Sequence, residues 1–172
     1  MLNYAKIYAD ELGGLCQPGE EIVDIISALY NPGREVEPDE SKTASFDPIN
    51  GLDVSAWNDA AEKLVGGVTL DTRRGHEAAD MARSFLSGSN LVLTTRNLMV
   101  VGNVSSDTTP DVSWEGTLES IAAITHDPRF PLELGRLRVD FADGSMVRLW
   151  GGLVLPFAAR RFVTSFGRTT RR

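Results

Sequence analysis

The stretch that decides the fold reads Leu137-Arg138-Val139-Asp140-Phe141-Ala142-Asp143-Gly144-Ser145-Met146-Val147-Arg148-Leu149-Trp150. Apolar and polar residues alternate on each side of Ala142-Asp143-Gly144, a pattern typical of two half-buried strands joined by a turn. A three-residue loop with Gly144 in the left-handed conformation pairs Val139 with Val147 and Leu137 with Leu149. A two-residue loop would instead set Val139 against Arg148. We predict the longer loop, because the buried pattern fixes the register.

Three further elements surround this hairpin in the C-terminal half of the chain. Residues 91–95 and 98–101 are apolar runs separated by Arg96-Asn97, which indicates a second hairpin. Residues 119–125 predict a single strand. Pro156 suits the first position of a helix, which we expect to stop at Gly167. An apolar helix face is expected from five residues: Phe157, Ala158, Phe162, Val163 and Phe166.

The N-terminal half shows a less regular pattern of apolar residues. Helical spacing of apolar residues over 4–15 predicts a helix, and the β-branched content of 21–30 favours a strand over a helix. Residues 31–53 hold three prolines and six acids, so we expect an exposed, flexible excursion there. Helices are expected over 55–64 and 75–87, with a short strand at 68–70 between them.

These segments resemble a bacterial pleckstrin-homology-like (PH-like) or GRAM-like domain. The resembling parts are residues 19–23 as a first strand, the hairpin at 91–102, the strand at 118–124, the run 135–144 and the terminal helix, about half of the chain. The resemblance implies an α+β fold, a PH-like antiparallel β-sandwich or barrel of about six or seven strands capped by a C-terminal α-helix. It also implies a non-enzymatic binding or scaffolding module.

The resemblance suggests a domain division as well. Residues 1–18 would form an N-terminal helix that packs on the domain, and 19–168 a single PH-like domain. Residues 31–89 would be a long insertion with additional helices, in which 31–54 is flexible, and 169–172 a disordered basic tail. PH domains that hold phosphoinositides use a short basic loop after the first strand, whereas the region after Tyr30 is long and acidic. That departure argues against phosphoinositide binding.

The charge is unevenly distributed along the chain. The net charge is −7, which argues against general nucleic-acid binding, because phosphate contacts need clustered cations. Residues 129–172 hold nine arginines against three acids, a charge of +6, so the other 128 residues carry −13. Such asymmetry suggests an acidic partner, or self-association of unlike faces. The alternative is that the two portions neutralise each other within one fold.

The arginines supply the candidate site. Arg136, Arg138 and Arg148 should share the outer face of the hairpin beside Trp150, where they could hold a carboxylate or phosphate. The alternative is a solvated face, or pairing with acids of the chain. Weaker candidates of the same kind are Arg160-Arg161 and Arg73-Arg74.

Nothing in the sequence marks a reaction. His76 and His126 belong to no metal-binding spacing, and Cys16 lacks a marked base. The glycine pairs form no phosphate-binding loop. We therefore expect no enzyme, no metal and no cofactor. An enzyme with an unrecognised site stays open, and a deep pocket holding either histidine beside acids would favour it.

The expected function is protein binding, with homo-oligomerisation plausible, through sheet edges and the groove beside the terminal helix. The second hypothesis is a peripheral membrane or anionic-lipid binder that uses the C-terminal arginines. A lone cysteine, an N-terminus without a signal pattern and the lack of a long apolar run predict a cytoplasmic protein.

Overall fold

A computed structural model describes residues 8, 12–37, 67–104, 109–129, 133–152 and 156–171. The strands, in chain order, are β1 (Ile22–Leu29), β2 (Arg34–Val36), β3 (Val68–Asp71), β4 (Asn90–Thr94), β5 (Asn97–Gly102), β6 (Asp111–Thr117), β7 (Ile121–His126), β8 (Arg136–Phe141) and β9 (Met146–Gly151). The helices are the short 3-10 turns η1 (Gly13–Leu15) and η2 (Leu118–Ser120), and the α-helices α4 (Glu77–Ser84) and α5 (Pro156–Thr169).

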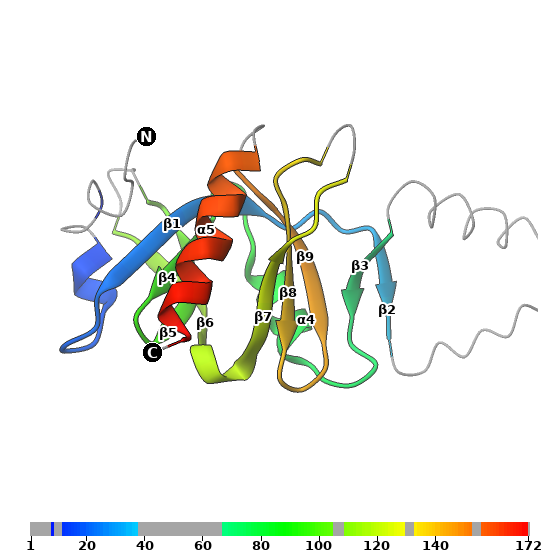
Figure 1. Ribbon diagram of the computed structural model, residues 1–172, viewed down its shortest axis with the longest axis horizontal. Coiled ribbons are helices and arrows are strands. Elements are labelled where there is room, and N and C mark those ends of the chain that lie inside the picture. The colour runs from blue at the N-terminus through cyan, green and yellow to red at the C-terminus, as the bar shows by residue number, and fades with distance from the viewer. Residues whose placement is uncertain are drawn as a thin grey trace, which may run out of the picture.

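The strands form one mixed sheet of two halves, which are joined where β1 pairs with β9. The first half-sheet is β1–β4–β5–β6, and the second is β2–β3–β9–β8–β7. Strand β1 pairs with β4 over most of its length, and its last residues, Ala28 and Leu29, pair with Gly151 and Trp150 of β9. Figure 1 shows β1 as the long strand that passes behind α5 and reaches β9. The fold is therefore α+β, and β2 with β3 is the one parallel pair among the described strands.

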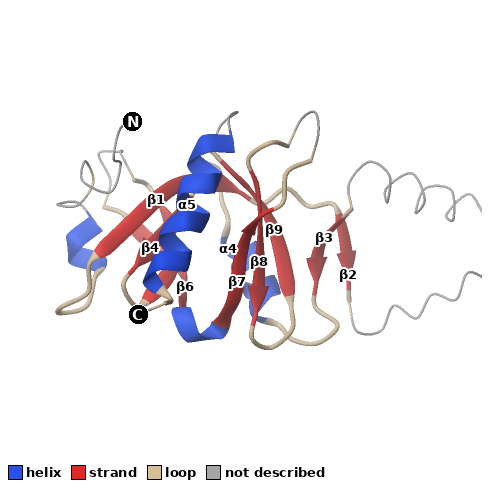
Figure 2. Ribbon diagram, in the orientation of Figure 1, coloured by secondary structure: helices blue, strands red, loops and turns tan. Residues whose placement is uncertain are grey.

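The main core holds residues of both half-sheets and of both α-helices in a single cluster. Helix α5 packs against β1 and β7 and buries Ala159, Phe162 and Phe166. Helix α4 packs against β3, β6, β8 and β9. Figure 2 shows the two helices at separate places along the sheet, α5 in front of β1 and α4 near β8 and β9. Burial of these apolar faces is the main favourable term for the fold.

A second, smaller core lies on the other face of the first half-sheet. Ile25, Val92 and Met99 point into it, and Leu12 of the N-terminal segment covers them with an exposed fraction of zero. Strand β4 is therefore buried on both faces. That double burial explains why residues 91–93 are continuously apolar instead of alternating.

The predicted hairpin register is confirmed. Val139 pairs with Val147 and Leu137 pairs with Leu149, and Gly144 has a φ of +86°. The loop also caps α4, because Asp143 Oδ2 accepts a hydrogen bond from the backbone N–H of Glu77 at 3.1 Å. One turn thus fixes both the strand register and the position of a helix.

A buried ion pair joins α5 to β1. Arg161 Nη2 lies 2.7 Å from Asp24 Oδ1, and the Asp24 side chain is 5% exposed. Ser165 Oγ donates a hydrogen bond to Asp24 Oδ2 at 2.8 Å, and Arg161 Nη2 donates another to the carbonyl of Ile25 at 2.8 Å. The register of β1 shifts between Ile22 and Asp24, so the carboxylate sits at an irregular point of the strand that faces the helix.

Several predictions at the ends of elements were wrong. Gly167 does not stop α5, which continues to Thr169. Phe157 is 57% exposed and does not belong to the buried face. The strand expected over 119–125 begins at Ile121, after η2. The second helix is shorter than 75–87, since Phe85 is already extended.

Two strands were missed. Strand β6 was not predicted, because Val112 and Trp114 are the only large apolar residues in 111–117, and they pack against different cores on the two faces of the half-sheet. Strand β2 lies inside the excursion expected to be flexible, and pairing with β3 orders it. The predicted strand at 68–70 is confirmed as β3.

The helix predicted over 55–64 lies outside the described residues, as does most of the N-terminal helix. Within the described part of that helix, Leu12 N donates to Tyr8 O at 2.9 Å and η1 follows.

Candidate functional site

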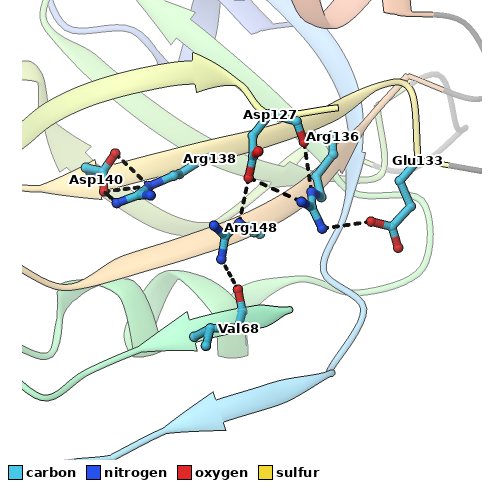
Figure 3. Close-up of polar contacts among 7 residues, drawn as sticks. All are labelled: Val68, Asp127, Glu133, Arg136, Arg138, Asp140 and Arg148. Carbon is cyan, nitrogen blue, oxygen red and sulfur yellow. Dashed lines mark hydrogen bonds and ion pairs between the residues drawn. The ribbon is translucent and has the colours of Figure 1, made fainter. Parts of the chain in front are cut away.

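The structure places the three hairpin arginines as the sequence predicts. Arg138 lies opposite Arg148, and Arg136 lies opposite Trp150. Their neighbours Leu137, Val139 and Leu149 point into the core, so the arginines project from the outer face of β8 and β9. Figure 3 shows the guanidinium groups and the side chains that they contact.

Asp127, just after β7, holds two of these arginines. Arg148 Nε lies 2.6 Å from Asp127 Oδ2, and Arg136 Nη2 lies 3.3 Å from the same oxygen. Arg136 also donates from Nε to the carbonyl of Asp127 at 2.9 Å and from Nη1 to Glu133 Oε2 at 2.9 Å. Arg148 Nη1 donates to the carbonyl of Val68. The network therefore ties the end of β7 to β8, β9 and the start of β3 (Figure 3).

The charges of this cluster cancel internally. Arg138 pairs with Asp140 on its own strand at 2.6 Å, and three arginines face three carboxylates. Burial opposes ionisation of Asp127, but the hydrogen bond from Arg148 and the charge of Arg136 outweigh it and hold the pKa of Asp127 below its ordinary value. An anionic ligand would have to displace a carboxylate that already uses the guanidinium donors.

The six predicted site residues do not form one site. Arg136, Arg148 and Trp150 line a cavity of about 260 Å³ together with Glu133. Arg161 is committed to Asp24, and Arg160 is exposed on α5. Arg138 lies outside that cavity, next to Asp140. Arg73 pairs with Asp71 at 2.6 Å, so it too is neutralised.

A groove of about 590 Å³ lies between β7 and α5. Its apolar surface comes from Ile124, Val163 and Phe166, and the small residues Ala122, Ala123 and Gly167 leave space above the strand. Arg168 and Arg171 are exposed at the groove, and no acidic residue lines it in the described part of the chain. Strand β7 pairs only with β8 among the described strands, so one edge of its backbone faces this groove unpaired.

A wider groove of about 880 Å³ lies between α4 and the β2–β3 pair. Leu70, Ala79 and Phe85 give it an apolar floor, while Glu35, Glu37 and Asp80 line it with carboxylates. Arg83 is the cationic residue of its lining, and His76 lines it as well. The Tyr30 hydroxyl donates to Glu35 Oε1 at 2.5 Å, and burial together with this bond raises the pKa of Tyr30.

The enzyme alternative required a deep pocket that holds a histidine beside acids, and His76 lines this groove together with three acids. The groove is open to solvent, and no hydrogen bond joins the His76 ring to a carboxylate in the described part of the chain. His126 is engaged elsewhere, with Nε2 2.7 Å from the carbonyl of Leu134. The structure shows no group of three or more metal-ligating residues among the residues that it describes.

Cys16 is a half-buried thiol whose Sγ donates to the carbonyl of Leu12 at 3.8 Å. Burial and the negative charges of Glu20 and Glu115 raise its pKa. A raised thiol pKa disfavours the thiolate, which is the opposite of what a nucleophile needs. A half-buried position of this kind suits a small packing residue.

The sequence singled out Val163, Phe166 and His76, but not as residues that line a groove. The sequence did suggest a groove beside the terminal helix, but not its lining, because the lining joins segments about forty residues apart. The signal available was the run of small residues Ala122-Ala123 on an edge strand followed much later by a basic helix end.

No family model, curated protein or solved structure matches this chain. None of the described helices is long and apolar enough to cross a membrane.

Proposed function

We propose that the chain is a PH-like, GRAM-like binding module that acts through protein–protein contacts in the cytoplasm. The arrangement that supports this proposal is a strand, β1, that joins two half-sheets, with α5 packed against β1 and β7 where the halves part. A lone cysteine agrees with a reducing compartment.

The groove between β7 and α5 is the binding site that we propose. An extended peptide can add to the unpaired edge of β7 and gain backbone hydrogen bonds, while its alternate side chains enter the space above Ala123. Arg168 and Arg171 give the groove two positive charges without a carboxylate in its described lining. We therefore infer that the peptide carries acidic side chains near its α5-facing end. The single observation that carries the proposal is this basic strand edge, which has no pairing strand among those that the structure describes.

Selection from a library of displayed random peptides tests the proposal. We expect the full chain to enrich acidic peptides, and Arg168→Glu/Arg171→Glu to weaken their binding at least about tenfold, since both charges reverse. The matched control is Arg160→Glu, an exposed arginine on the same helix that does not line the groove. Failure to enrich any peptide, or equal binding by the reversed variant, would refute the groove as the site.

The anionic-lipid alternative has less support. Arg136, Arg138, Arg148 and Arg161 are each paired with a carboxylate, which leaves Arg160, Arg168 and Arg171 as the exposed cations of the C-terminal portion that the structure describes. Sedimentation with vesicles that contain phosphatidylserine decides between the two. Pelleting that is lost in Arg160→Glu as well as in Arg168→Glu/Arg171→Glu would favour the membrane and contradict the peptide groove.

A further inference from the structure

Within the part of the chain that the structure describes, the second half-sheet has two open edges, and each is flanked by a helix. Strand β2 pairs only with β3 and strand β7 only with β8 within the described residues. Helix α4 forms one wall of the groove at the β2 edge, and α5 forms one wall of the groove at the β7 edge. An exposed edge is a template for pairing with another chain unless charge or cover prevents it.

Both grooves lie on the same face of this half-sheet. Cross-strand partners form one row from edge to edge, in the order Glu35, Leu70, Val147, Val139 and Ile124. Residues in such a row point to the same face of a sheet. Leu70 and Ile124 both belong to the main core, and each also lines one of the grooves. The β2 groove and the β7 groove are therefore the two ends of the core-facing side.

The two edges carry opposite charge. The groove at β2 has the carboxylates of Glu35, Glu37 and Asp80 against the guanidinium of Arg83, a net charge of −2 with His76 neutral. The groove at β7 has Arg168 and Arg171, a net charge of +2. Each edge thus has the charge that would attract the other edge and repel itself.

The strand directions also agree with pairing between copies. Strand β2 is parallel to β3, and each following pair, β3–β9, β9–β8 and β8–β7, is antiparallel. Strand β2 therefore runs opposite to β7. A second copy displaced across the sheet would bring its β2 antiparallel to β7 of the first, with α4 of one copy beside α5 of the other on the same face.

From these four observations we propose that the occupant of the β7–α5 groove is the β2 edge of a second copy of this chain. The contact joins unlike surfaces, so it is heterologous and generates a closed ring or an open filament. The acidic residues of β2 and α4 lie against Arg168 and Arg171 in this arrangement. This inference rests on the proposed function of the groove and names its partner.

Sedimentation of charge-reversed variants tests the inference. The groove variant is Arg168→Glu/Arg171→Glu, and the strand variant is Glu37→Lys/Asp80→Lys, which leaves the bond between Glu35 and Tyr30 intact. All four side chains are exposed, so folding is expected to be preserved and circular dichroism checks it. We expect the wild-type mass to rise with concentration at low salt and to fall to the monomer in about 1 M salt.

Each variant alone presents like charges at both edges, so its association should weaken at least about tenfold. An equimolar mixture of the two variants restores opposite charges at every contact and should associate again. Arg160→Glu and Asp111→Lys, which reverse exposed charges outside both grooves, should associate like wild type. A wild type that stays monomeric, variants that still associate, or a mixture that stays monomeric would each overturn the inference.

The peptide selection separates this inference from the proposed function. A monomeric wild type that still binds acidic peptides, and loses them in the groove variant, refutes self-association and keeps the groove. A wild type that neither associates nor binds any peptide refutes both proposals.

Discussion

Asp127 shows how a single carboxylate can decide whether a cluster of arginines binds a ligand or holds neighbouring strands together. The sequence places Arg136, Arg138 and Arg148 on one face because alternation in strands is strict. The sequence does not reveal that Asp127, nine residues before Arg136, turns back onto Arg136 and Arg148. The predicted placement was right, and the partners that neutralise the arginines emerged only from the tertiary fold.

The Asp127 carboxylate should make stability depend on pH. Its folded pKa lies below its unfolded value of about 3.9, so its contribution is complete above that value and is lost as pH falls through the folded pKa. We expect Asp127→Asn to cost about 1–2 kcal/mol near neutral pH, because two arginines lose a charged partner. Urea denaturation at several pH values measures this. A difference between wild type and variant that fails to shrink from about pH 5 to about pH 3 contradicts the assignment.

Among the polar residues, Asp24 should be the one whose substitution costs the most stability. Its carboxylate is 5% exposed and paired with Arg161, so Asp24→Ala leaves the guanidinium without its partner in a largely buried place. Loss of one partner of such a pair costs about 3–5 kcal/mol. Ser165→Ala, which removes one hydrogen bond to the same carboxylate, should cost about 1 kcal/mol. Equal midpoints of urea denaturation for wild type and Asp24→Ala would show that the network does not hold α5 in place.

At the scale of elements, local pattern and burial account for what could be predicted. The register of the hairpin of β8 and β9 could be predicted, since apolar alternation and one glycine leave a single good pairing. Strand β6 could not, because Val112 and Trp114 are its only large apolar residues and they pack on opposite faces of the half-sheet. Strand β2 could not either, because three residues beside prolines gain their order from β3.

The packing of α5 can be tested with two phenylalanines on one helix. Phe162 is completely buried and Phe157 is 57% exposed. Phe162→Ala should therefore destabilise the protein by about 3–5 kcal/mol through lost burial and a cavity. Phe157→Ala should change stability by no more than about 0.5 kcal/mol. Thermal or urea denaturation that ranks the two variants the other way round contradicts the buried face described here.

Substitution of Gly167 tests where α5 ends. This residue lies inside α5, and a Cβ added at this position would meet no heavy atom within 4 Å apart from the local helix backbone. Gly167→Ala should stabilise the protein by up to about 1 kcal/mol, because alanine is the better helix former. Gly144→Ala is the contrasting change, since Gly144 has a φ of +86° and its replacement should cost about 1–2 kcal/mol. If Gly167→Ala destabilised the protein, the helix would end before Thr169.

At the scale of the whole molecule, the opposite charges of the chain are only partly cancelled. Arg161 reaches Asp24 across the fold, and the hairpin arginines find carboxylates nearby, so much of the predicted neutralisation occurs within one copy. What is left is a basic groove at β7 and an acidic groove at β2. The sequence shows that acidic and basic residues are concentrated in different parts of the chain. Only the topology of the second half-sheet puts the charges that are not cancelled at opposite edges.

Hydrogen–deuterium exchange of β7 tests the central claim that this strand edge receives another strand. The amides of Ile121–His126 that do not pair with β8 should exchange slowly when wild type is concentrated or saturated with a selected acidic peptide, and faster in dilute protein alone. In the Arg168→Glu/Arg171→Glu variant the rates should be the same at both concentrations. Binding that leaves the exchange of β7 unchanged while protecting another surface would contradict the account.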